Sequence, residues 1–315
     1  MIRGALIALV CSTSVAAADP NDLVMSRLGT RVMNATGGID AVVGQNLEFR
    51  ALASQLGVVL APHLLTPADT LGFGGFQFDV DASQTTIDSK ASYWAARAGN
   101  GGDTMRTLGF FVRKGMWFPV PSFELGAGAV HLVGSTIWAA QLYAKLAVHE
   151  GFHDLPVPSI AVRAGVSRMM NQRELDLTVA SLDVTASYHI GIAGTVRIDP
   201  FVGWNLLMII PRSEVIDPTP NIDPLAPGNE KDSALNFVFK DQQTIFRNRF
   251  LVGAKLQYYI VQLTLEAEFA LKGSSVDDRA GTSDPCLPMS ATVACDAKDT
   301  AAAQTTVSMS LGVDF

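Results

Sequence analysis

Long stretches of this chain alternate apolar and polar residues with a period of two. In residues 261–272, Val261, Leu263, Leu265, Ala267, Phe269 and Leu271 alternate with Gln262, Thr264, Glu266, Glu268 and Lys272. Successive side chains of a β-strand point to opposite faces, so this pattern predicts a strand with one apolar and one charged face. The stretch runs for about twelve residues, whereas soluble strands average about 5–6 and tilted transmembrane strands need about 9–11. Its length therefore favours a strand that crosses a membrane.

The alternation recurs from about residue 70 to the end of the chain. It predicts ten strands, at 70–82, 103–114, 119–131, 135–148, 157–169, 174–189, 194–208, 244–258, 260–272 and 304–315. The connections after the even-numbered strands are short, and the long ones follow the first, seventh and ninth strands, as in bacterial outer-membrane barrels. We therefore expect an all-β fold, a closed antiparallel transmembrane β-barrel over residues 69–315. Weak strands within 83–102 or 228–243 would raise the count to 12–14, and an interruption near Ala180 predicts a bulge.

The apolar content is spread evenly along the chain. Mean hydropathy is +0.25 and charged residues make up 17 %. The longest internal apolar run, residues 206–210, is far shorter than the roughly 18 residues that a spanning helix needs. Lipid-facing strands produce such an even spread, because only alternate residues touch lipid. The net charge of −7 argues against a nucleic-acid partner, whose phosphates require a basic surface.

The first 18 residues predict a cleaved signal peptide. Arg3 forms a positive start, residues 5–10 a short apolar run, and three alanines end at Ala18. The alternative is a soluble N-terminal helix. Residues 19–68 lack period-2 alternation, contain Gly37 and Gly38, and predict one or two short helices. We expect this helical segment either on the periplasmic side or inside the barrel as a plug.

The final strand ends on an aromatic residue. Val307, Met309, Leu311, Val313 and Phe315 alternate with small or polar residues. This ending resembles the C-terminal assembly signal of bacterial outer-membrane β-barrel proteins. The resemblance covers about a dozen residues, and it implies a location in the bacterial outer membrane, with lipid and the barrel-assembly machinery as partners. The alternative is an ordinary strand that ends in Phe by chance.

The polar faces of the predicted strands are rich in charge. The lumen-lining candidates are Arg113, Glu124, Lys145, Arg163, Arg197, Asp199, Arg249, Lys255, Glu266 and Glu268, with Asp79, Asp183 and Lys272 beside them. A ten-strand barrel has a narrow interior, where unpaired charge is costly. We therefore expect a network of ion pairs that fills the lumen. The alternative is a polar conduit or ligand site in which Arg163, Arg197 and Arg249 contact an anion.

Other reactive residues give weaker signals. Cys286 and Cys295 lie in one polar segment and predict a disulfide in an oxidising compartment, since no histidine nearby suggests a metal site. His131 lies near Ser135, and Asp277 is followed by Asp278, but neither pair has the partners of a hydrolase. Zinc-ligand spacings and phosphate-binding loops are absent from the sequence. We expect no enzyme activity, no cofactor and no metal.

A barrel preceded by a helical segment suggests passage or binding of a small molecule, hydrophobic molecules included, across the outer membrane. In architecture alone the chain resembles the outer-membrane long-chain fatty-acid transporters, in which an N-terminal plug closes the lumen. None of that family's motifs is present, and the family has more than ten strands. The alternatives are a closed structural or surface-interaction barrel that acts through residues 209–243 and 273–303, and an outer-membrane hydrolase. The sequence does not identify a small-molecule ligand.

Overall fold

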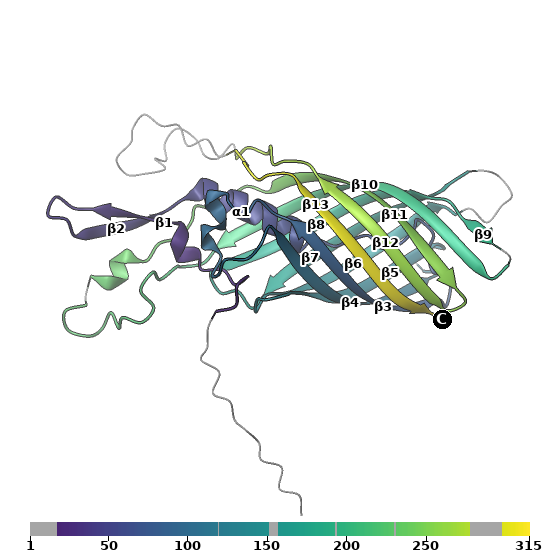
Figure 1. Ribbon diagram of the computed structural model, residues 1–315, viewed down its shortest axis with the longest axis horizontal. Coiled ribbons are helices and arrows are strands. Elements are labelled where there is room, and N and C mark those ends of the chain that lie inside the picture. Colours follow the sequence, from purple (N-terminus) through teal and green to yellow (C-terminus); the bar gives the residue numbers. More distant parts are fainter. Residues whose placement is uncertain (1–17, 119, 151–156, 193, 230, 278–297) are drawn as a thin grey trace, which may run out of the picture.

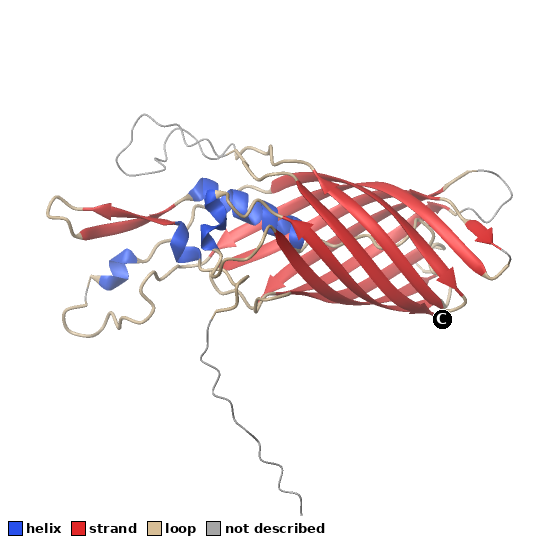
Figure 2. Cartoon of the chain, in the orientation of Figure 1, coloured by secondary structure: helices blue, strands red, loops and turns tan. Residues whose placement is uncertain are grey.

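The computed structural model describes residues 18–118, 120–150, 157–192, 194–229, 231–277 and 298–315. The described chain forms a long β-barrel with a helix in one end and a small hairpin beyond it (Figures 1 and 2). The predicted signal peptide, apart from Ala18, lies outside the described residues, as do Cys286, Cys295 and Asp278.

Ten antiparallel strands close the barrel. Around the ring they are β3 (Phe76–Thr86), β4 (Thr104–Met116), β5 (Phe123–Leu132), β6 (Trp138–His149), β7 (Ser159–Met170), β8 (Leu175–Ser187), β10 (Val196–Ser213), β11 (Ile245–Tyr258), β12 (Val261–Ala270) and β13 (Gln304–Asp314). Pairing of β13 with β3 and of β10 with β11 closes the ring of these ten strands. Within the described residues, a short strand, β9 (Ile190–Ile192), pairs with the start of β10 alone. The expected fold class and strand number are confirmed.

Two details of the predicted strands are wrong. The first barrel strand begins at Phe76 instead of residue 70, because residues 72–75 form a turn in which Gly72 and Gly74 have positive φ. The bulge expected near Ala180 does not occur, since Ala180 pairs in regular register with Val166 and Met208. The ladder shifts register instead between Ala147 and His149 of β6.

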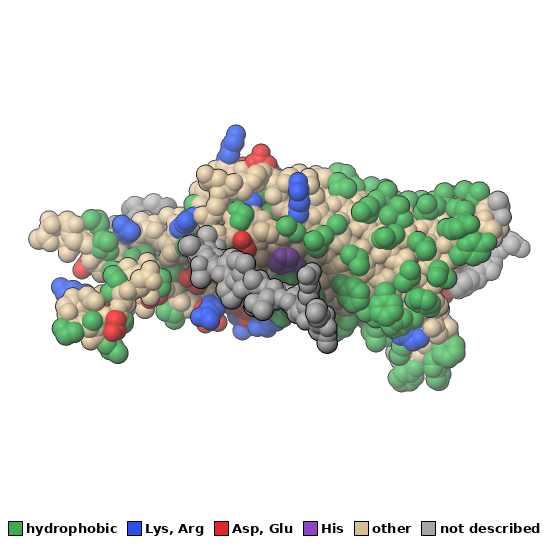
Figure 3. All heavy atoms as spheres, turned by 60° about the horizontal axis from the view of Figure 1, so that its bottom comes forward, with side chains coloured by type: hydrophobic (Ala, Val, Ile, Leu, Met, Phe, Trp, Pro, Cys, Tyr) green, Lys and Arg blue, Asp and Glu red, His purple; other side chains and the backbone are tan. Residues whose placement is uncertain are grey.

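The outer surface of the barrel is apolar. Six outward-facing side chains from six different strands are each 51–58 % exposed: Val80, Phe110, Leu142, Val202, Leu265 and Leu311. Figure 3 shows hydrophobic side chains over one end of the barrel, while charged side chains gather toward the opposite end. Such a band is the surface that lipid requires of a barrel. Within the described residues, no helix combines the length and the apolar character needed to span a membrane.

The two ends of the barrel differ in their connections. At the end that carries Phe315, β11 and β12 are joined by only Tyr259 and Ile260, and β4 and β5 by residues 117–122. Exposed aromatic side chains gather there, namely Phe73, Trp117, Phe118, Tyr188, Tyr258, Tyr259 and Phe315. At the other end, residues 87–103, 214–244 and 271–303 form long connections. We call the two ends the short-turn end and the long-loop end.

Residues 18–59 lie at the long-loop end. They form a 3-10 turn (Met25–Leu28), β1 (Gly29–Met33), β2 (Ile39–Gly44) and α1 (Asn46–Val59). The helix was predicted; the β1–β2 hairpin was not. Gly37 has φ 83°, and Asn34 Oδ1 accepts a hydrogen bond of 2.8 Å from the Gly38 amide, so the two glycines make a hairpin turn and not a break between helices.

Candidate functional site in the occupied lumen

Helix α1 fills the long-loop end of the barrel with an apolar core. Eleven of its fourteen residues are buried, among them Phe49, Leu52 and Leu56. They belong to the same core cluster as residues 175, 177 and 179 of β8 and residues 207 and 209 of β10. Figure 2 shows the helix inside the mouth of the barrel. Burial on this scale is typical of a permanent element of the core.

This packing explains the interrupted pattern of β8. Leu175, Leu177 and Val179 face α1, whereas Ser181 and Asp183, on the same inward face, lie beyond the helix. The inward face of one regular strand therefore changes from apolar to polar near Ala180. The apparent bulge in the sequence reflects a change in what the lumen contains.

Glycine at position 57 lets the helix approach the wall. A Cβ atom there would lie 2.6 Å from Ile209 Cδ1 and 2.8 Å from Ile209 Cγ1. These separations are well below van der Waals contact, so any larger side chain requires Ile209 to move.

After α1, residues 60–71 run through the lumen toward the short-turn end; we call them the luminal segment. Wall side chains bind its backbone. Gln141 and Ser167 donate to the carbonyl oxygen of Leu60 at 3.0 and 2.7 Å. Further along, Glu124 accepts from the Leu71 amide at 3.1 Å. Side chains of the barrel wall thus form hydrogen bonds with the backbone groups of a segment that is not part of any described strand.

Basic side chains bind the carbonyl groups in the middle of the luminal segment. Arg249 donates to Pro62 at 2.8 Å, Arg163 to His63 at 2.8 Å, and Arg113 to Leu65 at 3.2 Å. Lys145 donates to Pro67 and Asp69 at 3.3 and 2.8 Å. Glu266 accepts from the Leu65 amide at 3.0 Å, and Ser187 from the Ala68 amide at 3.0 Å.

The same wall residues also pair with one another. Four buried ion pairs lie along the middle of the lumen: Arg113–Asp79 at 3.0 Å, Lys145–Glu124 at 3.2 Å, Arg163–Asp183 at 2.8 Å and Arg249–Glu268 at 2.8 Å. Nearer the short-turn end, Arg197 pairs with Asp199 at 2.7 Å and with Asp69 of the luminal segment at 3.0 Å. Each partner offsets the desolvation of the other.

The residues predicted to line the lumen all lie inside the barrel. Nine of the ten are buried, and Arg197 is half-buried at the short-turn end. The three arginines predicted to contact an anion are Arg163, Arg197 and Arg249. Each binds a carboxylate or a carbonyl oxygen of this chain. Lys272 is exposed, just beyond the end of β12. The binding role of these residues stays a prediction.

Sequence reasoning did not identify three features of the lumen. The luminal segment has no periodic pattern, so its residues gave no sign that the wall charges would bind its backbone. Asp81 was counted only within a strand, although it is buried on the inward face of β3. His63 comes beside Glu266 and Glu268 only in the fold, where one ligand atom of each lies within 4.8 Å of the others. These three could hold a metal ion.

Those residues considered for hydrolysis that the structure describes, His131, Ser135 and Asp277, each bind a backbone group. His131 Nδ1 lies 3.2 Å from the carbonyl oxygen of Ile137, and Ser135 donates to the carbonyl oxygen of Leu132 at 2.7 Å. Asp277 accepts from the Gln243 amide at 2.8 Å. Each group therefore stabilises a turn or a loop.

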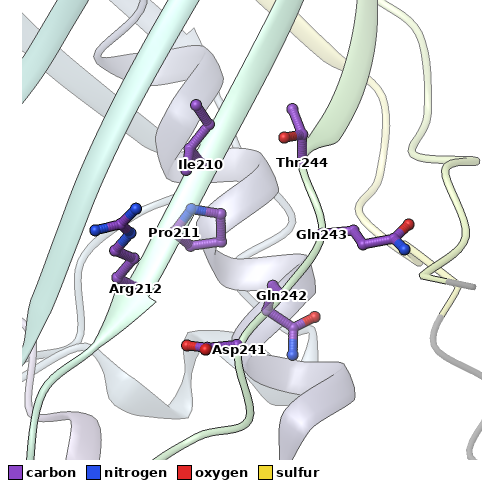
Figure 4. A pocket seen from close by; sticks show the side chains of 7 residues that line it. All are labelled: Ile210, Pro211, Arg212, Asp241, Gln242, Gln243 and Thr244. Carbon is purple, nitrogen blue, oxygen red and sulfur yellow. The ribbon is translucent and has the colours of Figure 1, made fainter. Parts of the chain in front are cut away.

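A pocket of about 600 Å³ opens where β10 and β11 separate (Figure 4). Their pairing ends at Ile209 and Ile245, and residues 241–244 diverge from Pro211 and Arg212. Arg50 of α1 donates to the carbonyl oxygen of Gln243 at 3.0 Å, which fastens this segment to the helix. The lining carries one guanidinium, one carboxylate and uncharged groups, a composition typical of a solvated notch.

A second pocket, of about 480 Å³, lies among the loops of the long-loop end and is lined by Arg27, Lys90 and Arg97. Arg27 donates to the carbonyl oxygen of Arg97 at 2.5 Å, and Arg97 donates to that of Gly102 at 3.0 Å. Burial lowers the pKa of Arg97, and nearby Asp103 opposes that shift. Both guanidinium groups brace the loops through carbonyl oxygens.

Known structures share the barrel arrangement at low similarity. Ail, the attachment invasion locus protein of Yersinia pestis, is 9 % identical over 77 % of this chain and 99 % of its own, with a TM-score of 0.28. The transport unit of the autotransporter AIDA-I from Escherichia coli is 6 % identical over 86 % of this chain and 98 % of its own, with a TM-score of 0.37. The outer-membrane protease OmpT from Escherichia coli is 9 % identical over 76 % and 95 %, with a TM-score of 0.28.

No protein-family model matches the sequence, and no curated protein matches it. The fold assignment therefore depends on the strand pairing of this chain itself.

Proposed function

We propose that this protein is a closed β-barrel of the bacterial outer membrane that displays a head at the cell surface. The head consists of residues 18–45 and the connections of the long-loop end. The observation that carries the proposal is the occupied lumen, in which α1 is buried in the apolar core and the luminal segment binds both sides of the wall. A barrel filled in this way holds its extramembrane residues in a fixed place.

The unequal ends support this orientation. Outer-membrane barrels have short periplasmic turns and longer extracellular loops. The Tyr259–Ile260 turn therefore faces the periplasm, and the β1–β2 hairpin projects outward (Figure 1). The head exposes apolar side chains, including Met33, Val215, Leu225 and Val238, which suit contact with another macromolecule.

An epitope inserted in the turn between β1 and β2, after Thr36, tests the orientation. We expect antibody to bind intact cells that carry this insertion. The matched control places the same epitope between Tyr259 and Ile260, where binding should require a permeabilised outer membrane. Labelling of intact cells by the second insertion alone would overturn the proposal.

Passage of a small molecule is a second candidate. Its support is the polar contact between the luminal segment and the wall, since water can replace hydrogen bonds to Arg163 and Arg249 if the segment moves. The apolar burial of α1 argues against passage. Water can replace hydrogen bonds, but it cannot replace the apolar contacts that would be lost if the helix left the barrel.

Planar-bilayer conductance separates the two candidates. The refolded full chain and an Arg163→Ala/Arg249→Ala variant are compared. A display barrel gives no current steps in either protein, because α1 keeps the lumen closed. Current steps in the full chain that become more frequent in the variant would favour passage.

A further inference from the structure

Three potential metal ligands meet where the luminal segment crosses β12. His63 comes from the segment, and Glu266 and Glu268 lie two residues apart on the inward face of the strand. All three side chains are more than nine-tenths buried, and one ligand atom of each lies within 4.8 Å of the others. His63 Nδ1 is 2.9 Å from Glu268 Oε2.

Each of the three residues retains one atom with unused hydrogen-bonding capacity. Among the described residues, no N–H or O–H group donates to Glu266 Oε1 or Glu268 Oε1, and His63 Nε2 has no partner, while the two carboxyl groups face each other. Buried polar atoms are normally paired, because leaving one unpaired costs about 1–3 kcal/mol. The three neighbouring side chains therefore keep donor atoms that are free to bind a cation, within a cluster in which one ligand atom of each lies within 4.8 Å of the others.

Two of the buried carboxylates of the described wall have no ion pair of their own. Five of its seven buried carboxylates form ion pairs with Arg or Lys, and Asp81 and Glu266 form none within the described chain. Neither oxygen of Asp81 has a hydrogen-bond partner there, and the electrostatic neighbours of Asp81 include His63 and Arg113. Of these two, Glu266 belongs to the cluster with His63, and a divalent cation bound there would offset the cost of burying its charge.

We infer that His63, Glu266 and Glu268 bind a divalent transition-metal ion, with Zn²⁺ as the best fit. Imidazole nitrogen and carboxylate oxygen are ordinary zinc ligands, and zinc accepts three protein ligands with a fourth position open. Ligand bonds of about 2.0–2.2 Å in tetrahedral geometry place the donor atoms roughly 3.4 Å apart, so those of the cluster, which lie within 4.8 Å of one another, need only a small adjustment. Arg249, 2.8 Å from Glu268 Oε2, then orients that carboxylate from outside the ligand set.

The ion would join the luminal segment to the wall. His63 lies about 200 residues from the two glutamates in sequence, and all three reach the site only when the segment is seated. Zinc binding is therefore a property of the folded barrel with its segment in place. It does not depend on which end of the barrel faces the cell exterior.

Zinc content of the refolded full chain tests this inference. The protein is refolded into detergent with ZnCl₂, freed of excess metal, and analysed by mass spectrometry for zinc per chain. Cys11→Ser, Cys286→Ser and Cys295→Ser form the background, because thiolates also bind zinc. We expect about one zinc per chain in this background, and zinc affinity at least about 100-fold weaker in His63→Ala and Glu266→Gln.

His131→Ala is the matched control, since His131 lies outside the site and contacts the Ile137 carbonyl. It should bind zinc as the background does. Heat-modifiable migration verifies that each variant is folded. If His63→Ala does not fold, the nearly isosteric Glu266→Gln decides. A background protein without zinc, or folded His63→Ala or Glu266→Gln with undiminished zinc, would overturn the assignment.

Discussion

Arg249 of β11 donates a hydrogen bond of 2.8 Å from Nη2 to the carbonyl oxygen of Pro62. Its Nη1 lies 2.8 Å from Glu268 Oε2, and its Nε donates to Asn205 Oδ1 at 2.9 Å. One guanidinium thus joins the luminal segment to β12 and β10. Because the wall charges and the segment's backbone satisfy each other's hydrogen bonds, neither is complete alone. The barrel and its luminal segment therefore form one folded unit.

Removal of this guanidinium should destabilise the barrel strongly. Arg249→Ala leaves Glu268 buried without its charged partner, and breaking a buried ion pair in this way costs about 3–5 kcal/mol of unfolding free energy. Urea unfolding in detergent, followed by tryptophan fluorescence, measures the loss. Arg168→Ala is the control, because Arg168 also lies 2.8 Å from a carboxylate, that of Asp176, but its side chain is 64 % exposed. It should cost less than about 1 kcal/mol, and equal losses would contradict the argument.

The contact between α1 and β10 predicts that the effect of a substitution at Gly57 on the unfolding free energy depends on the residue at position 209. Gly57→Ala gains about 1 kcal/mol in helix propensity, but overpacking against Ile209 costs about 1–3 kcal/mol, so we expect net destabilisation. In an Ile209→Ala background the new methyl group has room, and the same change should become neutral or stabilising. A double-mutant cycle of unfolding free energies measures the coupling. If Gly57→Ala has the same effect in both backgrounds, the close approach of Gly57 to Ile209 does not determine the cost of the substitution.

Period-2 alternation predicted the barrel well, because lipid imposes apolar residues on one face of every strand. Nine of the ten strands begin within about four residues of their expected positions, and inward residues such as Lys145 and Arg163 were identified from that pattern alone. The inward face of β8 departs from this pattern at Val179, because it packs there against α1 and does not face a polar lumen. Alternation reports the environment of a face and not only its secondary structure.

The contents of the lumen could not be predicted in the same way. Residues 60–71 are held by side chains that are distant in sequence, such as the Arg249 that binds Pro62. An extended segment without a strand partner has no periodicity, and its hydrogen bonds depend on tertiary structure. For the same reason His63 had no apparent link to Glu268 in the sequence.

Phe315 should matter more for assembly in cells than for stability. Its backbone pairs with Phe76 through hydrogen bonds of 2.8 and 3.0 Å, which Phe315→Ala retains, and its side chain is exposed. We expect the unfolding free energy of the refolded protein to change by less than about 1 kcal/mol. If the aromatic side chain is the assembly signal, the amount of this variant in the outer membrane falls. Unchanged amounts in the membrane would assign Phe315 no role in recognition.

Contact between the N-terminal residues and the barrel should weaken as pH rises. Glu174, in the loop between β7 and β8, accepts a hydrogen bond of 3.0 Å from the Met25 amide. Burial raises the pKa of Glu174 above its ordinary 4.5, and nearby Asp217 adds to this, while the Met25 hydrogen bond opposes it. The folded state therefore holds this proton more tightly than the unfolded state. The resulting stabilisation is complete below about pH 4.5 and is lost as pH rises through the raised pKa.

Resistance of residues 18–45 to limited proteolysis should thus be higher at mildly acidic than at neutral pH. Glu174→Gln removes the titration, so this variant should lose the dependence in that pH window. An equal pH response in the variant would mean that another group is responsible.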